Sequence, residues 1–174
     1  MSSAAPTRDD ALRAIVAGTT SAVSDDPDRG HVVFRVDGTG GEGVRTHLRI
    51  NDHTLLVDEP PALGGDNAAP NPVETALAGL LSCQVVTYRF WAAELGIPLD
   101  DISIEVEGDL DVRGFFGVDD AVRPGFGEVR VVVTLDGPAD PERYQELAAT
   151  VDAHCPVLDL FRNPTQVTTT VHTA

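Results

Sequence analysis

The chain of 174 residues contains two cysteines, Cys83 and Cys155, which are its clearest candidates for chemistry. Cys83 lies in an apolar stretch, where a lone cysteine commonly serves as a small hydrophobic side chain. Pro156 favours the first position of a helix, so Cys155 is expected to be the N-cap residue. The free N–H groups and the dipole of a helix N-terminus lower a thiol pKa, which predicts Cys155 as the more acidic thiol. Cys83 would need a nearby cation, such as an arginine, to become a thiolate.

His154, beside Cys155, raises two alternatives. A Cys–His hydrolase would need a third orienting group and an oxyanion motif, and neither is visible. A Cys/Cys/His metal site would need paired ligand spacing, which is also missing. The sequence contains no P-loop and no dinucleotide-binding fingerprint. We therefore expect no metal and no cofactor.

The charge balance limits the partners. Twelve arginines, no lysine and 28 acidic residues give a net charge of -16. Such a field repels phosphate groups, so nucleic acid and anionic membranes are not expected as partners. The acidic, lysine-free composition suits a high-salt cytoplasm or a GC-rich genome, and the sequence does not distinguish these.

The cysteine count and the N-terminus indicate the compartment. Two cysteines are too few for a disulfide-rich secreted scaffold. The N-terminal residues show no basic segment followed by an apolar core, and the apolar stretch 75–88 is shorter than the ~18 residues of a spanning helix. These features predict a cytoplasmic protein.

A long helix is expected to carry Cys83. Asn71 suits the N-cap, Pro72 the first turn and Glu74 the third helical position, while Gly96 ends the helix. The first four turns are apolar on nearly every side, so we expect this helix to be buried all round. One domain of this size can hardly surround it, which predicts a dimer interface.

The remaining patterns predict an α+β fold, an antiparallel sheet packed on two long helices. The expected strands are 31–37, 44–50, 53–58, 102–112, 128–135 and 165–171, and the other expected helices are 8–17, 141–154 and a short turn at 156–161. We interpret residues 1–30 as an N-terminal appendage, a short helix and a polar linker, and residues 31–174 as the domain.

The strand 44–50 places three basic side chains on one face, namely Arg45, His47 and Arg49. This face either meets solvent or directs an arginine at an anionic centre.

Three segments carry a resemblance to a known family. They are VDEPPALGGDNAAPNPVETALAGLLSC, DLDVRGFFGVDDAVRPGFGEVRVVV and HCPVLDLFRNP. Together they resemble the OsmC/Ohr family of thiol-dependent peroxidases over roughly residues 31–172, and the OsmC-like branch more than the Ohr branch. The resemblance implies an OsmC-like fold, an intertwined homodimer with two active sites at its interface, and a role in oxidative-stress defence.

The resemblance also implies the site. Cys83 matches the peroxidatic cysteine and Cys155 the resolving one. Glu74 matches the family's acid, one position later than in the Ohr branch, and Arg45, or as second choice Arg35, matches the arginine that supports the thiolate. The implied substrate is an organic hydroperoxide, and the implied reductant is a dithiol or a lipoyl protein.

Apolar side chains are expected to form the substrate pocket around Cys83. They are Leu80 in the same helix and, in a loop that could close over the thiol, Phe115, Phe116 and Phe126. Such walls favour hydroperoxides with an alkyl or aryl tail. An alternative function is a non-catalytic dimeric module that holds a small hydrophobic ligand in this pocket.

Overall fold

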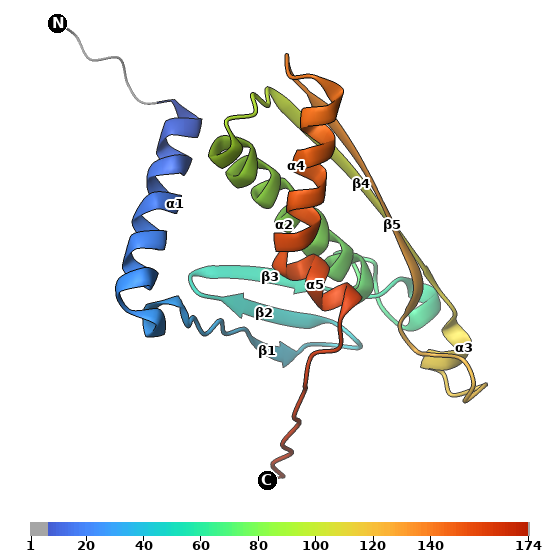
Figure 1. Ribbon diagram of the computed structural model, residues 1–174. Helices are drawn as coiled ribbons and strands as arrows, with labels where there is room; N and C mark the ends of the chain where they lie inside the picture. The colour runs from blue at the N-terminus through green and yellow to red at the C-terminus, as the bar shows by residue number, and fades with distance from the viewer. Residues whose placement is uncertain (1–6, 174) are drawn as a thin grey trace, which may run out of the picture.

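Helix α2, Pro72–Leu95, runs through the middle of the computed structural model, which describes residues 7–173 (Figure 1). Its first turn contains a capping box. The Asn71 side chain accepts the Glu74 N–H and the Glu74 carboxylate accepts the Asn71 N–H, both at 2.8 Å. Gly96 ends the helix with a left-handed φ of 62°, which glycine adopts without a steric penalty. The predicted limits of this helix are confirmed.

Two antiparallel sheets accompany the helices and confirm the α+β class. The first has the order β1-β2-β3, with the bounds Asp37–Gly40, Thr46–Ile50 and His53–Val57. The second pairs β4, Asp101–Leu110, with β5, Phe126–Asp136. Residues along β4 alternate between half-buried and exposed, as the sequence predicts, and Ile102, Ile104 and Val106 pack against the core.

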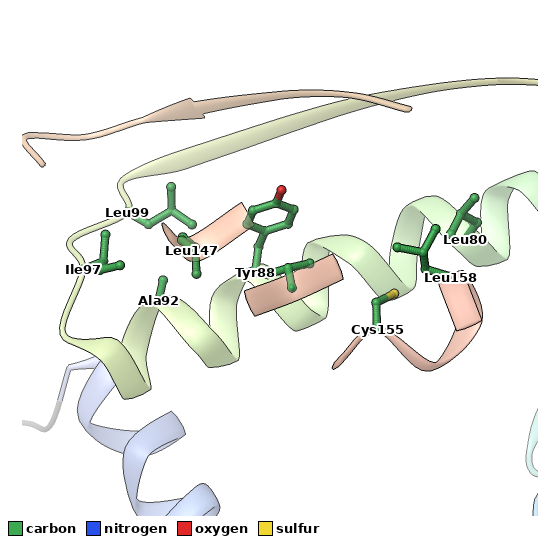
Figure 2. Packing of buried hydrophobic residues seen from close by; sticks show 9 residues of the cluster. Leu80, Tyr88, Ala92, Ile97, Leu99, Leu147, Cys155 and Leu158 are labelled. Carbon is green, nitrogen blue, oxygen red and sulfur yellow. The ribbon is translucent and has the colours of Figure 1, made fainter. Parts of the chain in front are cut away.

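Two helices of the C-terminal half pack against α2 (Figure 1). They are α4, Pro141–His154, and α5, Pro156–Arg162, and both match the predicted segments. Figure 2 shows the buried cluster that these helices share, which consists of Leu80, Tyr88, Ala92, Ile97, Leu99, Leu147, Val151, Cys155 and Leu158. The shorter helical segments are η1 (Pro27–Gly30), η2 (Pro61–Leu63) and α3 (Val112–Phe115). The core therefore joins the segments that carry the two cysteines.

Helix α1 spans Arg8–Asp25 and packs along α2. The expected end of this helix at residue 17 is wrong, since the helix continues through Gly18. A glycine inside a helix costs roughly 1 kcal/mol, an amount that other contacts can offset. Here the Arg8 guanidinium donates to the Leu99 carbonyl at 2.9 Å and Arg13 donates to the Ala93 carbonyl at 3.1 Å. These contacts attach the N-terminal segment to the C-terminal end of α2.

Two strand predictions are wrong. Residues 31–36 form no strand, and β1 instead begins at Asp37 and includes residues that were expected in the turn. The turn is tighter than predicted, because the Gly41 N–H donates to the Arg45 carbonyl at 2.7 Å. Residues 165–171 have no regular structure. Both segments have the alternation of a strand, but a strand also needs a neighbouring edge with which to pair, and the described chain pairs neither of them.

The expectation that α2 is buried all round is not met by the single chain. Val86 is 55% exposed, and Val73 at the start of the helix is also exposed. None of the helices within residues 7–173 is long and apolar enough to cross a membrane.

Candidate functional site

Cys83 and Cys155 lie side by side, although 72 residues separate them in the sequence. Their sulfur atoms are 3.5 Å apart, and the Cys155 S–H donates to Cys83 Sγ. Both are free thiols; Cys155 is 2% exposed and Cys83 is half-buried. A disulfide has an S–S distance of about 2.05 Å, so the two atoms would have to approach by about 1.5 Å. The geometry is that of a reduced pair close enough to be oxidised to a disulfide.

Helix α2 carries Cys83 and Thr87 on the same face. Residues four apart lie one above the other on a helix, so Thr87 shares the face of Cys83. Its hydroxyl donates to the Cys83 carbonyl at 2.8 Å, and Thr87 itself is buried. Thr87 was not among the predicted site residues, although its spacing of four residues from Cys83 indicates that the two share a helix face.

Cys155 joins α4 to α5. Its N–H donates to the Val151 carbonyl at 2.9 Å, which completes α4. Its carbonyl accepts the Asp159 N–H at 3.0 Å, and Pro156 occupies the first turn of α5, so Cys155 is the N-cap as predicted. The thiol is fixed on both sides by helical backbone, while its side chain makes no capping hydrogen bond and stays available to Cys83.

Burial raises the pKa of the Cys155 thiol above its ordinary value. The Leu158 N–H of α5 acts in the opposite direction, and the contact with Cys83 raises the pKa further. The prediction that the helix N-terminus makes Cys155 an acidic thiol is therefore wrong, because desolvation outweighs the helical N–H group. A protonated Cys155 has the S–H that it donates to Cys83.

Glu74 lies at the start of α2, where its carboxylate caps the helix through the Asn71 N–H. Arg45 lies just before β2, and its guanidinium forms an ion pair with Asp66 at 2.7 Å. Within residues 7–173 these two side chains do not form the pair that was expected to support the thiolate. Each is engaged by a partner of its own.

Asp58 organises the loop that holds Arg45. Its carboxylate is 1% exposed and accepts the N–H groups of Ala68 at 3.0 Å and Asp66 at 3.1 Å. The Ala68 N–H is the main cause that lowers the pKa of Asp58, and the Arg45 charge adds to it. Arg45 Nε is 3.9 Å from Asp58 Oδ2 and is buried without a hydrogen-bond acceptor among the described residues. Arg45 thus has a structural role in the loop before α2.

The other basic candidates are exposed. His47 and Arg49 face solvent, as the first of the two alternatives predicted, and Arg49 pairs with Asp37 at 3.2 Å. Arg35 is also exposed, in the segment before β1. Arg45 is the one residue of the expected basic face that is partly buried.

A cavity of about 720 Å³ lies between α2, β5, α4 and α5, and we call it the α2–β5 cavity. Leu80 and Phe126, two of the four side chains expected around the substrate, line it. Neither cysteine is among its lining residues. Two buried polar residues that the sequence analysis missed also line it, Gln84 and Tyr88, and their spacing of four on α2 marks them as neighbours.

Phe115 and Phe116 do not line this cavity. They lie at α3, between β4 and β5, and are 66% and 57% exposed. Their rings contact each other edge to face, with centroids 4.9 Å apart. Phe126 instead packs with Phe161 at a centroid distance of 6.4 Å. The expected aromatic wall is therefore divided between the cavity and the far end of the β4–β5 hairpin.

His154 is engaged away from the thiols. Its ring packs on Trp91 with centroids 4.4 Å apart, and its Nδ1 lies 2.8 Å from the Thr150 carbonyl oxygen. This geometry gives the Cys–His hydrolase alternative no support. Over residues 7–173, no group of three or more His, Cys, Asp or Glu side chains is arranged to hold a metal ion.

Comparison with known proteins supplies a family. A family model described as OsmC-like protein matches residues 64–170 of the chain. No curated protein matches the chain.

Solved structures share the fold at low sequence identity. An OsmC-like protein from Mycoplasma pneumoniae is 16% identical, with a TM-score of 0.64 over 75% of this chain and 88% of that one. An organic hydroperoxide resistance protein OsmC from Legionella pneumophila is 24% identical, with a TM-score of 0.59 over 75% and 90%. The organic hydroperoxide resistance protein OhrB of Bacillus subtilis is 23% identical, with a TM-score of 0.52 over 75% and 91%. At these identities the likeness shows the fold, which confirms the expected OsmC-like architecture.

Proposed function

The chain belongs to the OsmC-like protein family, and from this membership we propose that it is a thiol-dependent peroxidase that reduces organic hydroperoxides. The observation that carries the proposal is the 3.5 Å distance between the sulfur atoms of Cys83 and Cys155. Two of the similar structures are named as organic hydroperoxide resistance proteins, which supports this substrate class.

The proposed reaction starts at Cys83. Its thiolate attacks the terminal oxygen of the hydroperoxide, the O–O bond breaks, and the alkoxide leaves and takes a proton to become an alcohol. The Cys83 sulfur is then a sulfenic acid. The Cys155 sulfur attacks the Cys83 sulfur, the S–O bond breaks, water leaves, and a disulfide forms. One hydroperoxide has been reduced and two thiols have been oxidised.

A dithiol reductant closes the cycle. One of its thiolates attacks the disulfide, a mixed disulfide forms, and its second thiol releases the protein with both cysteines reduced. A small dithiol or a lipoyl protein has this chemistry, and we propose either as the electron donor, in the cytoplasm.

The contact geometry supports these roles. Cys83 is the more exposed sulfur and accepts the S–H, so it is the one that a peroxide can reach. Cys155 is buried beneath it, as suits a second thiol that must react with the Cys83 sulfenic acid and with little else.

We also propose that the active form is a homodimer. The single chain leaves apolar side chains in water on α2, where Val86 is 55% exposed, and before β1, where Phe34 is 90% exposed. Stable obligate dimers bury roughly 2,000 Å² or more, and such side chains are suited to that interface. In this assembly we keep Arg45 and Glu74 as proposed supports of the thiolate. Light scattering that gave the mass of one folded chain would contradict the dimer.

The proposal is tested by substitution of each cysteine. With cumene hydroperoxide and a dithiol donor, Cys83→Ser should consume peroxide no faster than buffer, because it has no nucleophilic sulfur at the attack position. With the dithiol left out, Cys155→Ser should form the sulfenic acid on Cys83 with one hydroperoxide and then accumulate sulfinic acid as further hydroperoxide oxidises it. If Cys83→Ser keeps the wild-type rate, the proposal is wrong.

A further inference from the structure

One residue that lines the α2–β5 cavity carries an amide side chain that no other described residue hydrogen-bonds. Gln84 lines the cavity and is only 3% exposed. No residue in the described part of the chain forms a hydrogen bond with its side-chain amide. Neither polar atom of this amide is among the buried atoms of residues 7–173 that lack a partner, so the amide is open to the cavity that Gln84 lines. The amide of Gln84 is therefore placed to bind something that enters the cavity.

Tyr88 lies one turn further along the same face of α2. It is also 3% exposed, and burial together with the negative charge of Asp152 raises its pKa to about 12. Its hydroxyl is thus neutral at physiological pH and able both to donate and to accept a hydrogen bond. Figure 2 shows this hydroxyl directed away from the α2 axis, toward the strands. Gln84 and Tyr88 together present two neutral hydrogen-bonding groups.

The charged side chains around the cavity are mostly neutralised by neighbours. Asp152 pairs with Arg162 at 2.9 Å. Glu128 pairs with Arg130 at 3.2 Å. Arg123 is exposed and makes no ion pair within residues 7–173, so it marks the rim. The interior therefore offers no unpaired buried charge to an ionic group.

Apolar side chains form the other part of the cavity wall, beside these charged residues. They include Leu80 of α2, Phe126 and Val131 of β5, and Leu158 of α5. The volume of about 720 Å³ lies within the usual range for small-molecule sites, roughly 300–1,000 Å³. A ligand that filled it would bury an apolar body and present a polar end to Gln84 and Tyr88.

We propose that the α2–β5 cavity binds a neutral amphiphile, an apolar chain with an amide or hydroxyl head group that Gln84 and Tyr88 hydrogen-bond. Neither cysteine lines the cavity, so this site goes beyond the proposed peroxidase chemistry and does not depend on it.

Calorimetric titration of the reduced full-length protein tests the proposal, with octanamide as the probe. Octanamide should bind, and Gln84→Leu should weaken its binding at least tenfold because the amide pairing is lost. Gln145→Leu is the matched control, since Gln145 is exposed on α4 outside the cavity, and it should stay within twofold of the wild type. Octanoate has the same chain with a charged head group and should bind more weakly than octanamide.

A second set of measurements keeps the proposal decidable if Gln84→Leu does not fold. Tyr88→Phe should weaken octanamide binding several-fold, and Val131→Phe, which fills the cavity from β5, should abolish it. In the wild type, the side-chain NH₂ signals of Gln84 should shift on addition of octanamide. Any of three results would overturn the proposal: no binding up to the solubility limit, binding of octanoate as tight as that of octanamide, or binding that none of these variants changes.

Discussion

Cys83 and Cys155 meet inside the helical core, whereas Arg45 and Glu74 are held by separate partners outside it. The sulfur atoms are brought together by the packing of α2 against α4 and α5, which buries Leu80, Leu147 and Val151 completely. Arg45 and Glu74 are instead fixed by polar contacts of their own, Arg45 to Asp66 and Glu74 to the backbone of the α2 cap. Packing in the core has joined two distant segments, and polar contacts outside it hold the other two side chains in separate places.

The difference follows from composition. Two cysteines in 174 residues leave one possible thiol pair, so packing of their helices is sufficient to form it. Twelve arginines among 28 acidic residues leave each guanidinium many partners. Some of these partners are close in the sequence, as for Arg113 with Asp111, and others are distant, as for Arg45 with Asp66. An ion pair between distant residues is therefore much harder to infer than a contact between buried ones.

Substitution of Arg45 tests whether its position outside the core also excludes it from the thiol site. If Arg45 supports the thiolate in the assembled protein, Arg45→Met should lower kcat/KM for cumene hydroperoxide at least tenfold. Arg49→Met is the control, because Arg49 is exposed and pairs only with Asp37 among the described residues, and it should change kcat/KM less than twofold. Equal rates for the two variants would restrict Arg45 to the structural role that the single chain shows.

The helix-capping role of Glu74 can be separated from the effect of its negative charge by two substitutions. Glu74→Ala removes half of the capping box and should lower the free energy of unfolding by about 1 kcal/mol, as urea titration would measure. Glu74→Gln keeps the capping oxygen and should retain most of that stability. Glu94→Ala, at an exposed position of the same helix, should cost less than about 0.5 kcal/mol.

If Glu74 also acts on the thiol site, Glu74→Gln should lower peroxidase activity while the fold stays stable. If the variant is stable and has wild-type activity, Glu74 acts only as a cap of α2.

The smallest expected effect is a pH dependence of stability that comes from Cys155. Its pKa is raised in the folded chain, so below the ordinary thiol pKa of roughly 8.5 both states keep the proton and its stabilising effect is fully present. As pH rises, the unfolded chain loses the proton first, and stability falls until the pH has passed the raised pKa of the folded chain. Urea titrations under reducing conditions between about pH 8 and pH 10 should show a steeper loss for wild type than for Cys155→Ala. Parallel curves would mean that the burial of Cys155 has no such effect.

The sequence predicted the elements that local signals define. Asn71, Glu74 and Gly96 marked both ends of α2, and alternation marked β4. It failed for residues 31–36 and 165–171, where the pattern of a strand is present but the pairing edge that a strand requires is not within the described chain. Strand pairing is a long-range property, so alternation alone cannot supply it.

For the candidate site as well, some features were predicted from the sequence and others were not. The contact of Cys83 with Cys155 was expected from the resemblance, and the structure brings the two together. The ionisation of Cys155 was not predictable, because the sequence shows the helix N-terminus but not the burial that outweighs it. Gln84 and Tyr88 were not predicted as site residues, because their burial arises from the packing of β5 and α5 against α2, which the sequence alone does not show.

The central claim is that the two thiols form a redox pair, and mass spectrometry tests it most directly. The reduced protein is treated with one equivalent of cumene hydroperoxide, alkylated without further reduction and digested. The account predicts a peptide pair joined by a Cys83–Cys155 disulfide, the loss of two hydrogen atoms per chain, and no alkylated cysteine. Two fully alkylated thiols after the peroxide has been consumed would contradict it.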